Sequence, residues 1–502
     1  MQRKINDGAA YTQIVDAFKK RRDGATVADI VARTALPIEK VKELIPAVAD
    51  EYGARLRVTE SGEILYSFPD GFKSRYRGFR ATMKRVLSAV GKAAVAVGTA
   101  AFKVWIVVML VGYFVLFMAI ALVALMASVA VSASGSGSSD DRSSSRRGGG
   151  LGGLYLASRI FDLVIRIWFY SELTKSMDGY AYGRRGYAAK PKRRPLNQAV
   201  FSFVFGDGDP NADWETRERK AVIAYIQANR GVIALPEFMA LTGATSADAE
   251  RRITSYLVEF GGSPEATEDG TVVYRFDEIL KRLDRTDRSF AGLTAPIKRL
   301  KTFSSNPRKM NGWFIAFNGI NLAFGSYFLT CALAIGPIVQ QAQITGSTYL
   351  YAIALTLFSP LTDPVAFAAV GLGVVPLAFA ALFYLIPALR SASEKTENER
   401  IKNENLRKEG YRRVWESPMK ASPSDLDPAA AECRPQDMPM ARERVLKELG
   451  NYAMPEVAIA EDGRTVYSFV ELEREKKALE RYRLSIKGDD SSLGATVFDS
   501  HA

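Results

Sequence analysis

Residues 104–131 read VWIVVMLVGYFVLFMAIALVALMASVAV, an apolar run of 28 residues without a charged side chain. A helix needs about 20 such residues to cross the hydrocarbon core of a bilayer, so this run can span with length to spare, either tilted or extending beyond the core. A buried helix of a soluble protein is a poor explanation for a run of this length. The sequence therefore predicts an integral membrane protein.

Two other runs, residues 315–339 and 365–389, are long and apolar enough for further spans. Both contain glycine and proline, which membrane helices tolerate. Residues 348–358 between them are apolar but too short to cross alone, which favours a re-entrant or interfacial piece.

Residues 154–169 form a fourth apolar segment, but it carries Arg159, Asp162 and Arg166 on one helical face. The segment can lie in the interface as an amphipathic helix. It can also cross, with this charged stripe turned toward partner helices or lining a polar path.

The distribution of basic residues favours crossing. Residues 71–103 contain eight Lys/Arg and no acid, and residues 179–200 contain six and no acid, whereas residues 340–364 contain no Lys or Arg. Basic segments that flank membrane helices usually stay on the cytoplasmic side. All of these basic segments lie on that side only if residues 154–169 cross the membrane. We therefore expect four spans in the cell (inner) membrane with both termini cytoplasmic. A small arginine cluster at 142–147 would then lie in an outer loop, against the rule that basic residues stay inside.

A short pattern occurs three times outside these segments. Gly62-x-x-x-Tyr66-x-Phe68 recurs as Gly270-x-x-x-Tyr274-x-Phe276 and as Gly463-x-x-x-Tyr467-x-Phe469, each time after one or two acidic residues. The glycine predicts a turn, and the alternation after it predicts a strand.

Helical periodicity precedes the first two copies, over residues 11–20, 27–33 and 37–52 and over residues 217–229, 235–242 and 246–260. Three short helices followed by a hairpin is the order of a winged helix. The third copy is less regular, with a Pro- and Asp-rich middle at 417–439 and a final helix at 441–449. The fold class we expect is an α-helical multi-pass membrane protein with α+β winged-helix-like soluble domains.

Charge argues against nucleic acid as the partner of these domains, because phosphate contacts dominate such binding. Residues 1–70 carry 11 Lys/Arg and 11 Asp/Glu, residues 211–285 carry 10 and 13, and residues 411–485 carry 13 and 14. The chain's net charge of +12 lies instead in the membrane flanks, where topology and anionic lipids explain it.

No catalytic or cofactor motif is visible. The only histidine is His501, and the two cysteines, Cys331 and Cys433, have unlike contexts. An incomplete EF-hand-like frame places oxygen side chains at Asp207, Asp209, Asn211, Asp213 and Glu218, but it has Ala212 where the calcium loop needs glycine. The simpler interpretation is a turn whose Asp213 caps the following helix, after an apolar strand or short buried run at 201–205.

Two stretches carry a family resemblance. FSFVFGDGDPN at residues 201–211 and the Gly-x-Ile-x-Tyr-x-Phe-Pro strand at residues 62–69 resemble those of an uncharacterised family of multi-pass membrane proteins. Its members occur in bacteria, including cyanobacteria, and in plastids. The resemblance implies a membrane location and no established activity. Some plant members carry an iron–sulfur biosynthesis label, which does not transfer because a cluster needs several thiolates within reach of one another.

These observations predict a non-enzymatic membrane scaffold or adaptor without a cofactor. Its cytoplasmic repeats would bind a protein partner or each other, while its flanks contact membrane lipids. A membrane-tethered DNA-binding regulator and a transporter or lipid-handling protein that uses the charged stripe are the alternatives. The expected division is: winged-helix-like domains at 1–70, 211–285 and, in degenerate form, 411–485; spans at 104–131, 154–169, 315–339 and 365–389; basic juxtamembrane segments at 71–103 and 286–314; a Gly/Ser/Arg-rich loop at 132–153; a basic linker at 170–210; a loop at 340–364; a charged helical linker at 390–410; and a tail at 486–502.

Overall fold

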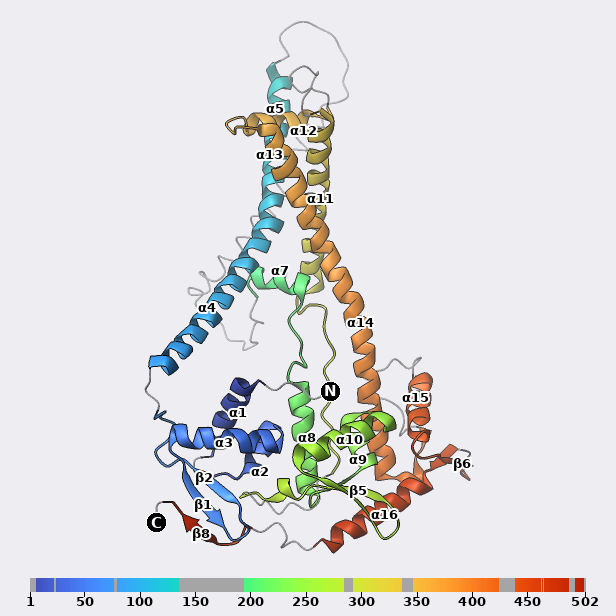
Figure 1. Ribbon diagram of the computed structural model, residues 1–502. Helices are drawn as coiled ribbons and strands as arrows, with labels where there is room; N and C mark the ends of the chain where they lie inside the picture. The colour runs from blue at the N-terminus through green and yellow to red at the C-terminus, as the bar shows by residue number, and fades with distance from the viewer. Residues whose placement is uncertain are drawn as a thin grey trace, which may run out of the picture. The chain divides into compact units, whose positions relative to one another are not determined.

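The structure is a computed structural model, mostly helical with three small sheets (Figure 1). It describes residues 6–21, 24–75, 79–134, 194–283, 292–335, 346–423, 438–486 except 462 and 464, and 493–500. The chain divides into two compact units. We call Met1–Arg85, Asp209–Lys301 and Thr396–Ala502 the repeat unit, and Val86–Gly208 with Thr302–Lys395 the span unit.

The span unit contains the long apolar helices. They are α4 (Phe79–Val107), the π-helical turn η1 (Val108–Gly112) and α5 (Tyr113–Ser134); α11 (Arg308–Ile335); and α13 (Pro364–Ala369), the π-helical turn η3 (Val370–Val374) and α14 (Val375–Glu416). Three stretches among the described residues are long and apolar enough to cross a membrane: Ala93–Val129, Arg308–Ile335 and Pro364–Glu416. They coincide with the uninterrupted apolar runs of the sequence. Residues 154–169, with Arg159, Asp162 and Arg166, lie outside the described residues.

Buried amides and small residues join these helices. Asn321 in α11 donates to the carbonyl of Leu110 at 2.8 Å, and Asn318 donates to the carbonyl of Ala380 at 3.1 Å. Gly325 and Gly373 let α11 and η3 approach closely, because a Cβ at Gly325 would lie 3.3 Å from the Gly373 carbonyl oxygen. Small side chains and interhelical hydrogen bonds are the usual means of packing helices in a membrane. The short α12 (Tyr349–Leu357) has nine residues, too few to cross.

The C-terminal part of the linker expected at 170–210 contains a helix. Residues 201–205 belong to α7 (Leu196–Phe205), so the interpretation of this run as a strand is wrong. Its buried residues Ala199, Val200, Phe203 and Val204 follow helical spacing, and Phe203 stacks on Phe383 of α14. The helix lies across the helices of the span unit (Figure 1).

The repeat unit contains three segments, each with one of the hairpins that the short sequence pattern marks. The first has α1 (Asp7–Lys19), α2 (Val27–Thr34), α3 (Ile38–Tyr52), β1 (Arg55–Thr59) and β2 (Ile64–Ser67). The second has α8 (Trp214–Ala228), β3 (Val232–Ala234), α9 (Leu235–Thr242), α10 (Ser246–Phe260), β4 (Ser263–Ala266), β5 (Val272–Arg275) and the 3-10 turn η2 (Glu278–Leu280). The third has the end of α14, the 3-10 turn η4 (Pro418–Lys420), α15 (Met438–Gly450), β6 (Glu456–Ile459), β7 (Thr465–Ser468) and α16 (Val470–Ser485), and β8 (Thr496–Asp499) follows it.

Local sequence explains the ends of several helices. The Thr26 hydroxyl accepts from the Asp29 amide while the Asp29 carboxylate accepts from the Thr26 amide, which is a capping box at the start of α2. Glycines in the left-handed region end α3, α9 and α10, at Gly53, Gly243 and Gly261.

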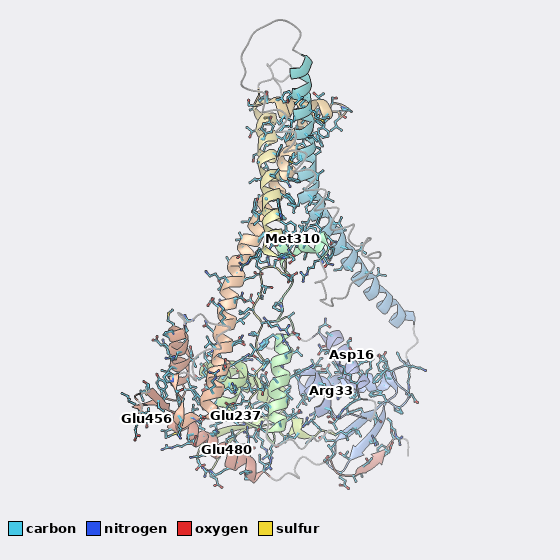
Figure 2. The ribbon with its side chains drawn as sticks, turned by 180° about the vertical axis from the view of Figure 1, so that it is seen from behind. Asp16, Arg33, Glu237, Met310, Glu456 and Glu480 are labelled. Atoms are coloured by element: carbon cyan, nitrogen blue, oxygen red, sulfur yellow. The ribbon has the colours of Figure 1, made fainter. Side chains whose placement is uncertain are left out.

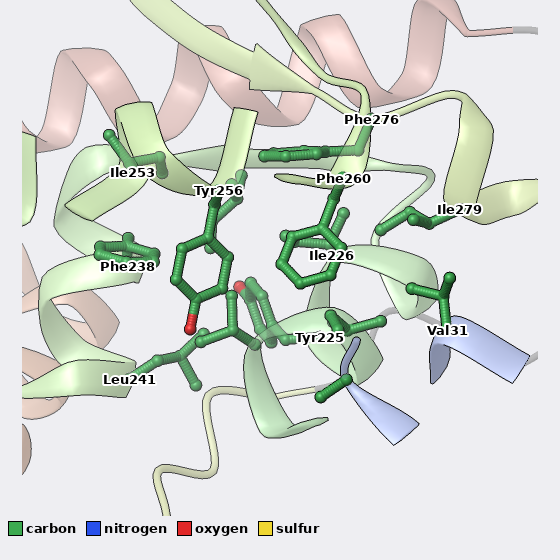
Figure 3. Close-up of a cluster of buried hydrophobic side chains, with 14 of the residues drawn as sticks. Val31, Tyr225, Ile226, Phe238, Leu241, Ile253, Tyr256, Phe260, Phe276 and Ile279 are labelled. Carbon is green, nitrogen blue, oxygen red and sulfur yellow. The ribbon is translucent and has the colours of Figure 1, made fainter. Parts of the chain in front are cut away.

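The three segments share one apolar core. In the close-up of the second segment, Tyr256 lies between Phe238 and Phe260, Ile226 lies beside Phe260, and Val31 of the first segment lies beside Ile279 (Figure 3). Buried residues of the third segment, including Val445, Leu449 and Phe469, belong to the same cluster. Because burial of apolar surface is the main force that stabilises a fold, this shared cluster helps to hold the three segments together.

Candidate interaction site

The repeated tyrosines occupy the same position in three hairpins. In each hairpin the tyrosine pairs with a residue of the preceding strand: Leu56 with Tyr66, Pro264 with Tyr274, and Val457 with Tyr467. On its other side each tyrosine pairs with a residue far upstream, namely Ala25, Ile233 and Ala421. Each tyrosine therefore has a pairing partner on both sides, the preceding strand on one and an upstream residue on the other.

The other two motif residues have equally clear roles. Gly62, Gly270 and Gly463 have φ of +79°, +79° and +77°, a conformation that other residues rarely adopt, so the turn requires glycine. Phe68, Phe276 and Phe469 are at most 1% exposed and anchor each hairpin to the core. The short pattern in the sequence thus marks the same turn and the same anchor three times.

The outer edge of the first hairpin is occupied. Strand β8, near the end of the chain, pairs antiparallel with β1 and places Asp499 opposite Arg57. Asp499 also accepts a hydrogen bond from Arg55 Nε at 2.8 Å, and the Ser500 amide donates to the Leu56 carbonyl. This addition of a strand covers backbone groups that an edge would otherwise leave unpaired.

Side chains of α16 contact the second hairpin. Tyr482 donates to Glu265 on β4, and Arg481 pairs with Asp269 at the turn, 2.6 Å apart. Farther along the same helix, Arg483 forms a buried pair with Glu237, the residue that also accepts from Tyr225 at 2.6 Å.

The third hairpin has neither kind of contact: among the described residues, no strand pairs with the outer edge of β6 and no side chain of another helix is hydrogen-bonded to it. All four of its residues are exposed. Its apolar side chains Val457 and Ile459 are 64% and 78% exposed, and the nearby Met454 is 81% exposed. Glu456 lies at the periphery of its segment in Figure 2. An apolar edge strand with open hydrogen-bonding groups is a template for another chain.

The last helix before the hairpin carries paired charges in both the first and the second segment. In α10, Arg251 pairs with Asp248 and Arg252 pairs with the buried Glu218. In α3, Lys40 lies 2.9 Å from Asp7, and Lys42 lies 3.5 Å from Glu278 of the second segment. Each of these cations has a carboxylate beside it, which reduces the net positive charge that these helices offer to phosphate.

The FGDGDPN stretch divides between the two units at Asp209. In the span unit, Asp207 accepts hydrogen bonds from the Ser305 hydroxyl at 2.6 Å, the Ser305 amide at 2.8 Å and Ser202 at 2.9 Å, and it pairs with Arg194. Burial opposes ionisation, but these hydrogen bonds lower the pKa of Asp207 to about 2. Asp207 therefore joins the end of α7 to the loop before α11.

Two further residues of the stretch have structural roles. A Cβ at Gly206 would lie 2.5 Å from Arg390 Nη1, and this arginine donates to the carbonyls of Phe203 and Phe303. In the repeat unit, Asn211 exchanges two hydrogen bonds with the backbone of Arg299, at 2.7 and 2.9 Å.

The calcium-loop residues do not come together. Asp207 and Asp209 accept from protein donors, Asp213 pairs with Arg217, and Glu218 is buried against Trp214 and Arg252. Among the described residues no group of three metal-binding side chains occurs. The expected cap is also wrong, because Asp213 stands at the N-cap of α8 but its side chain makes no capping hydrogen bond.

One buried ion cluster escaped the sequence reasoning. Lys408 of α14 is 2% exposed and lies 3.0 Å from Glu404, 3.9 Å from Glu218 and 4.1 Å from the centre of the Trp214 ring. Burial lowers the pKa of Lys408, although both carboxylates oppose the shift. The i, i+4 spacing of Glu404 and Lys408 was the available signal, but it is common on exposed helices.

These features define a mostly helical protein with three candidate membrane spans and a few small sheets. The chain is similar to an uncharacterised chloroplastic protein of Arabidopsis thaliana, 25% identical over 281 residues. The match covers 55% of the present chain and 50% of the plant protein, so the chain spans about half of that relative's length. This likeness fits an uncharacterised family with plastid members, and it carries no information on iron–sulfur chemistry. No family model and no solved structure matches the chain.

Proposed function

We propose that this protein is a non-enzymatic membrane scaffold or adaptor whose repeat unit binds protein. The three segments are, in this proposal, winged-helix domains. The element order of the second segment supports this, since three helices with one strand after the first are followed by a hairpin, and its sheet has the order β3-β5-β4. We place the repeat unit on the cytoplasmic side of an inner membrane, in keeping with the basic flanks.

The observation that carries the proposal is the outer edge of β6. The first hairpin pairs its outer edge with strand β8, and the second is contacted by side chains of α16, whereas the third has neither contact among the described residues and exposes Val457 and Ile459. Strand addition to an open edge provides main-chain hydrogen bonds for affinity and side-chain contacts for specificity. The paired charges of α3 and α10 favour a protein partner over DNA.

Co-purification of the full chain tests the proposal. After cross-linking in membranes and gentle solubilisation, we expect the wild type to emerge with a second protein chain, which can be another copy of itself. Val457→Pro should weaken this association, because proline removes one donor at the edge. Recovery of the wild-type chain alone, as a monomer, would argue against a scaffold.

A further inference from the structure

The direction of the backbone groups on β6 follows from its partner β7. The Tyr467 amide donates to the Ala421 carbonyl at 2.8 Å, and the Ala421 amide donates to the Tyr467 carbonyl at 3.1 Å. In an antiparallel ladder the amide and carbonyl of one residue point to the same side. Tyr467 therefore faces Ala421, and its opposite residue Val457 directs both groups away from β7. By alternation, Ile459 does the same.

Hydrogen bonding thus selects how a second strand can add to this edge. A partner must place its own outward-facing residues opposite Val457 and Ile459. Pro455, just before the strand, has no amide and cannot extend the ladder on that side. The open edge offers two residues with both a donor and an acceptor, enough for four main-chain hydrogen bonds.

A second copy of β6 meets this requirement. When two copies pair antiparallel with Val457 opposite Ile459 of the second copy, both outward-facing residues of each strand find partners. Ala458 then faces its own counterpart across a two-fold axis, and Glu456 faces Ala460 rather than another carboxylate. Apolar pairs lie on one face, and no like charges are directly opposed. The strand is therefore complementary to itself, as a two-fold interface requires.

The tail strand β8 fits this edge less well. On β1, Asp499 is held by Arg55. The pairing of Leu56 with Tyr66 and of Val457 with Tyr467 makes Glu456 the counterpart of Arg55. A copy of β8 on β6 would consequently bring Asp499 next to Glu456, and like charges there are unfavourable.

We propose that two copies of this protein associate by antiparallel pairing of their β6 strands. The inference rests on the proposed function as a scaffold and names the partner at its site. Four residues on each side make a small contact. Confinement of both copies to one membrane raises their effective concentration, which strengthens a weak contact without new interactions.

A cysteine at the two-fold axis tests this register. Directly opposed residues that do not exchange hydrogen bonds have Cα atoms about 4.5 Å apart, within the range that a disulfide bridges. We expect Ala458→Cys, made in the full chain with Cys331→Ala and Cys433→Ala, to form a disulfide-linked dimer in membranes under mild oxidation. Glu456→Cys is the matched control, since the two copies of residue 456 lie about four residues apart along the ladder, roughly 13 Å. We expect at least a tenfold faster cross-linking at 458.

The outcomes separate this inference from the proposed function. Equal rates at 458 and 456, with the wild type still dimeric by single-molecule photobleaching, would overturn the β6 register and leave the scaffold in place. A disulfide in the double variant Ala458→Cys, Asp499→Cys but not in Ala458→Cys alone would assign the edge to the tail strand, and would also overturn the inference. A wild type that is monomeric and captures no other protein would remove both.

Discussion

Replacement of Arg483 by methionine tests whether the third segment is fixed to the second. Glu237 is 1% exposed and accepts four hydrogen bonds, from Tyr225 Oη, the Ala234 amide, and Arg483 Nη1 and Nη2. Arg483→Met removes two of these donors and the cation that pairs with the buried Glu237 carboxylate. The loss of one member of a buried ion pair costs about 3–5 kcal/mol. Because two donors remain, we expect the lower end, about 3 kcal/mol, or roughly a 150-fold change in an opening equilibrium.

Hydrogen–deuterium exchange of the full chain in lipid nanodiscs measures this opening. Amides of α16 and α9 should lose roughly 100-fold in protection in Arg483→Met, whereas those of α1 should change much less. Arg481→Met on the same helix is the control, because Arg481 and Asp269 are 66% and 46% exposed and such a pair contributes about 0–1 kcal/mol. Protection in α16 that is equal in the two variants would refute the idea that the buried pair holds the third segment.

Substitutions at Gly206, at Asp207 and in β6 test three other parts of the chain. Gly206→Ala should lower the thermal unfolding temperature of the full chain more than Gly208→Ala, because both glycines have positive φ but only a Cβ at Gly206 meets Arg390; an equal effect would mean that backbone strain alone matters. Folding lowers the pKa of Asp207 from its ordinary value of 3.8 to about 2. The stabilisation by its ionised carboxylate is therefore present above pH 3.8 and is lost as the pH falls toward about 2. The stability difference between wild type and Asp207→Asn should shrink over this range, and a constant difference would contradict the assignment. Val457→Pro should leave the β6–β7 hairpin protected from exchange, whereas Ala458→Pro should open it, since only the Ala458 amide points toward β7.

The sequence was most informative where a pattern was long or repeated. Apolar runs located the three candidate spans among the described residues, and period-based predictions placed α9 at 235–242 and α10 at 246–260, the bounds found in the structure. The Gly-x-x-x-Tyr-x-Phe pattern located all three hairpins because each motif residue has a separate structural role. The glycine adopts a positive φ at the turn, the tyrosine pairs on both sides of its strand, and the phenylalanine is buried in the core.

Long-range partners were beyond such reasoning. The alternation of Thr496–Asp499 is too short to indicate that it pairs with a strand more than 400 residues earlier. Nothing local to Arg483 shows that its guanidinium meets Glu237 instead of water. The helix α7 was mistaken because five consecutive residues from Phe201 are mostly apolar and fit either period. The open edge of β6 became visible only when the three hairpins could be compared in space.

The number of copies per particle tests the central claim most directly. The full chain, labelled with one fluorophore and diluted in a lipid bilayer, can be counted by single-molecule photobleaching. If two copies pair through β6, we expect mainly two-step bleaching for the wild type and mainly one-step bleaching for Val457→Pro, at equal protein density. Single steps for the wild type, or a two-step distribution that Val457→Pro leaves unchanged, would contradict it.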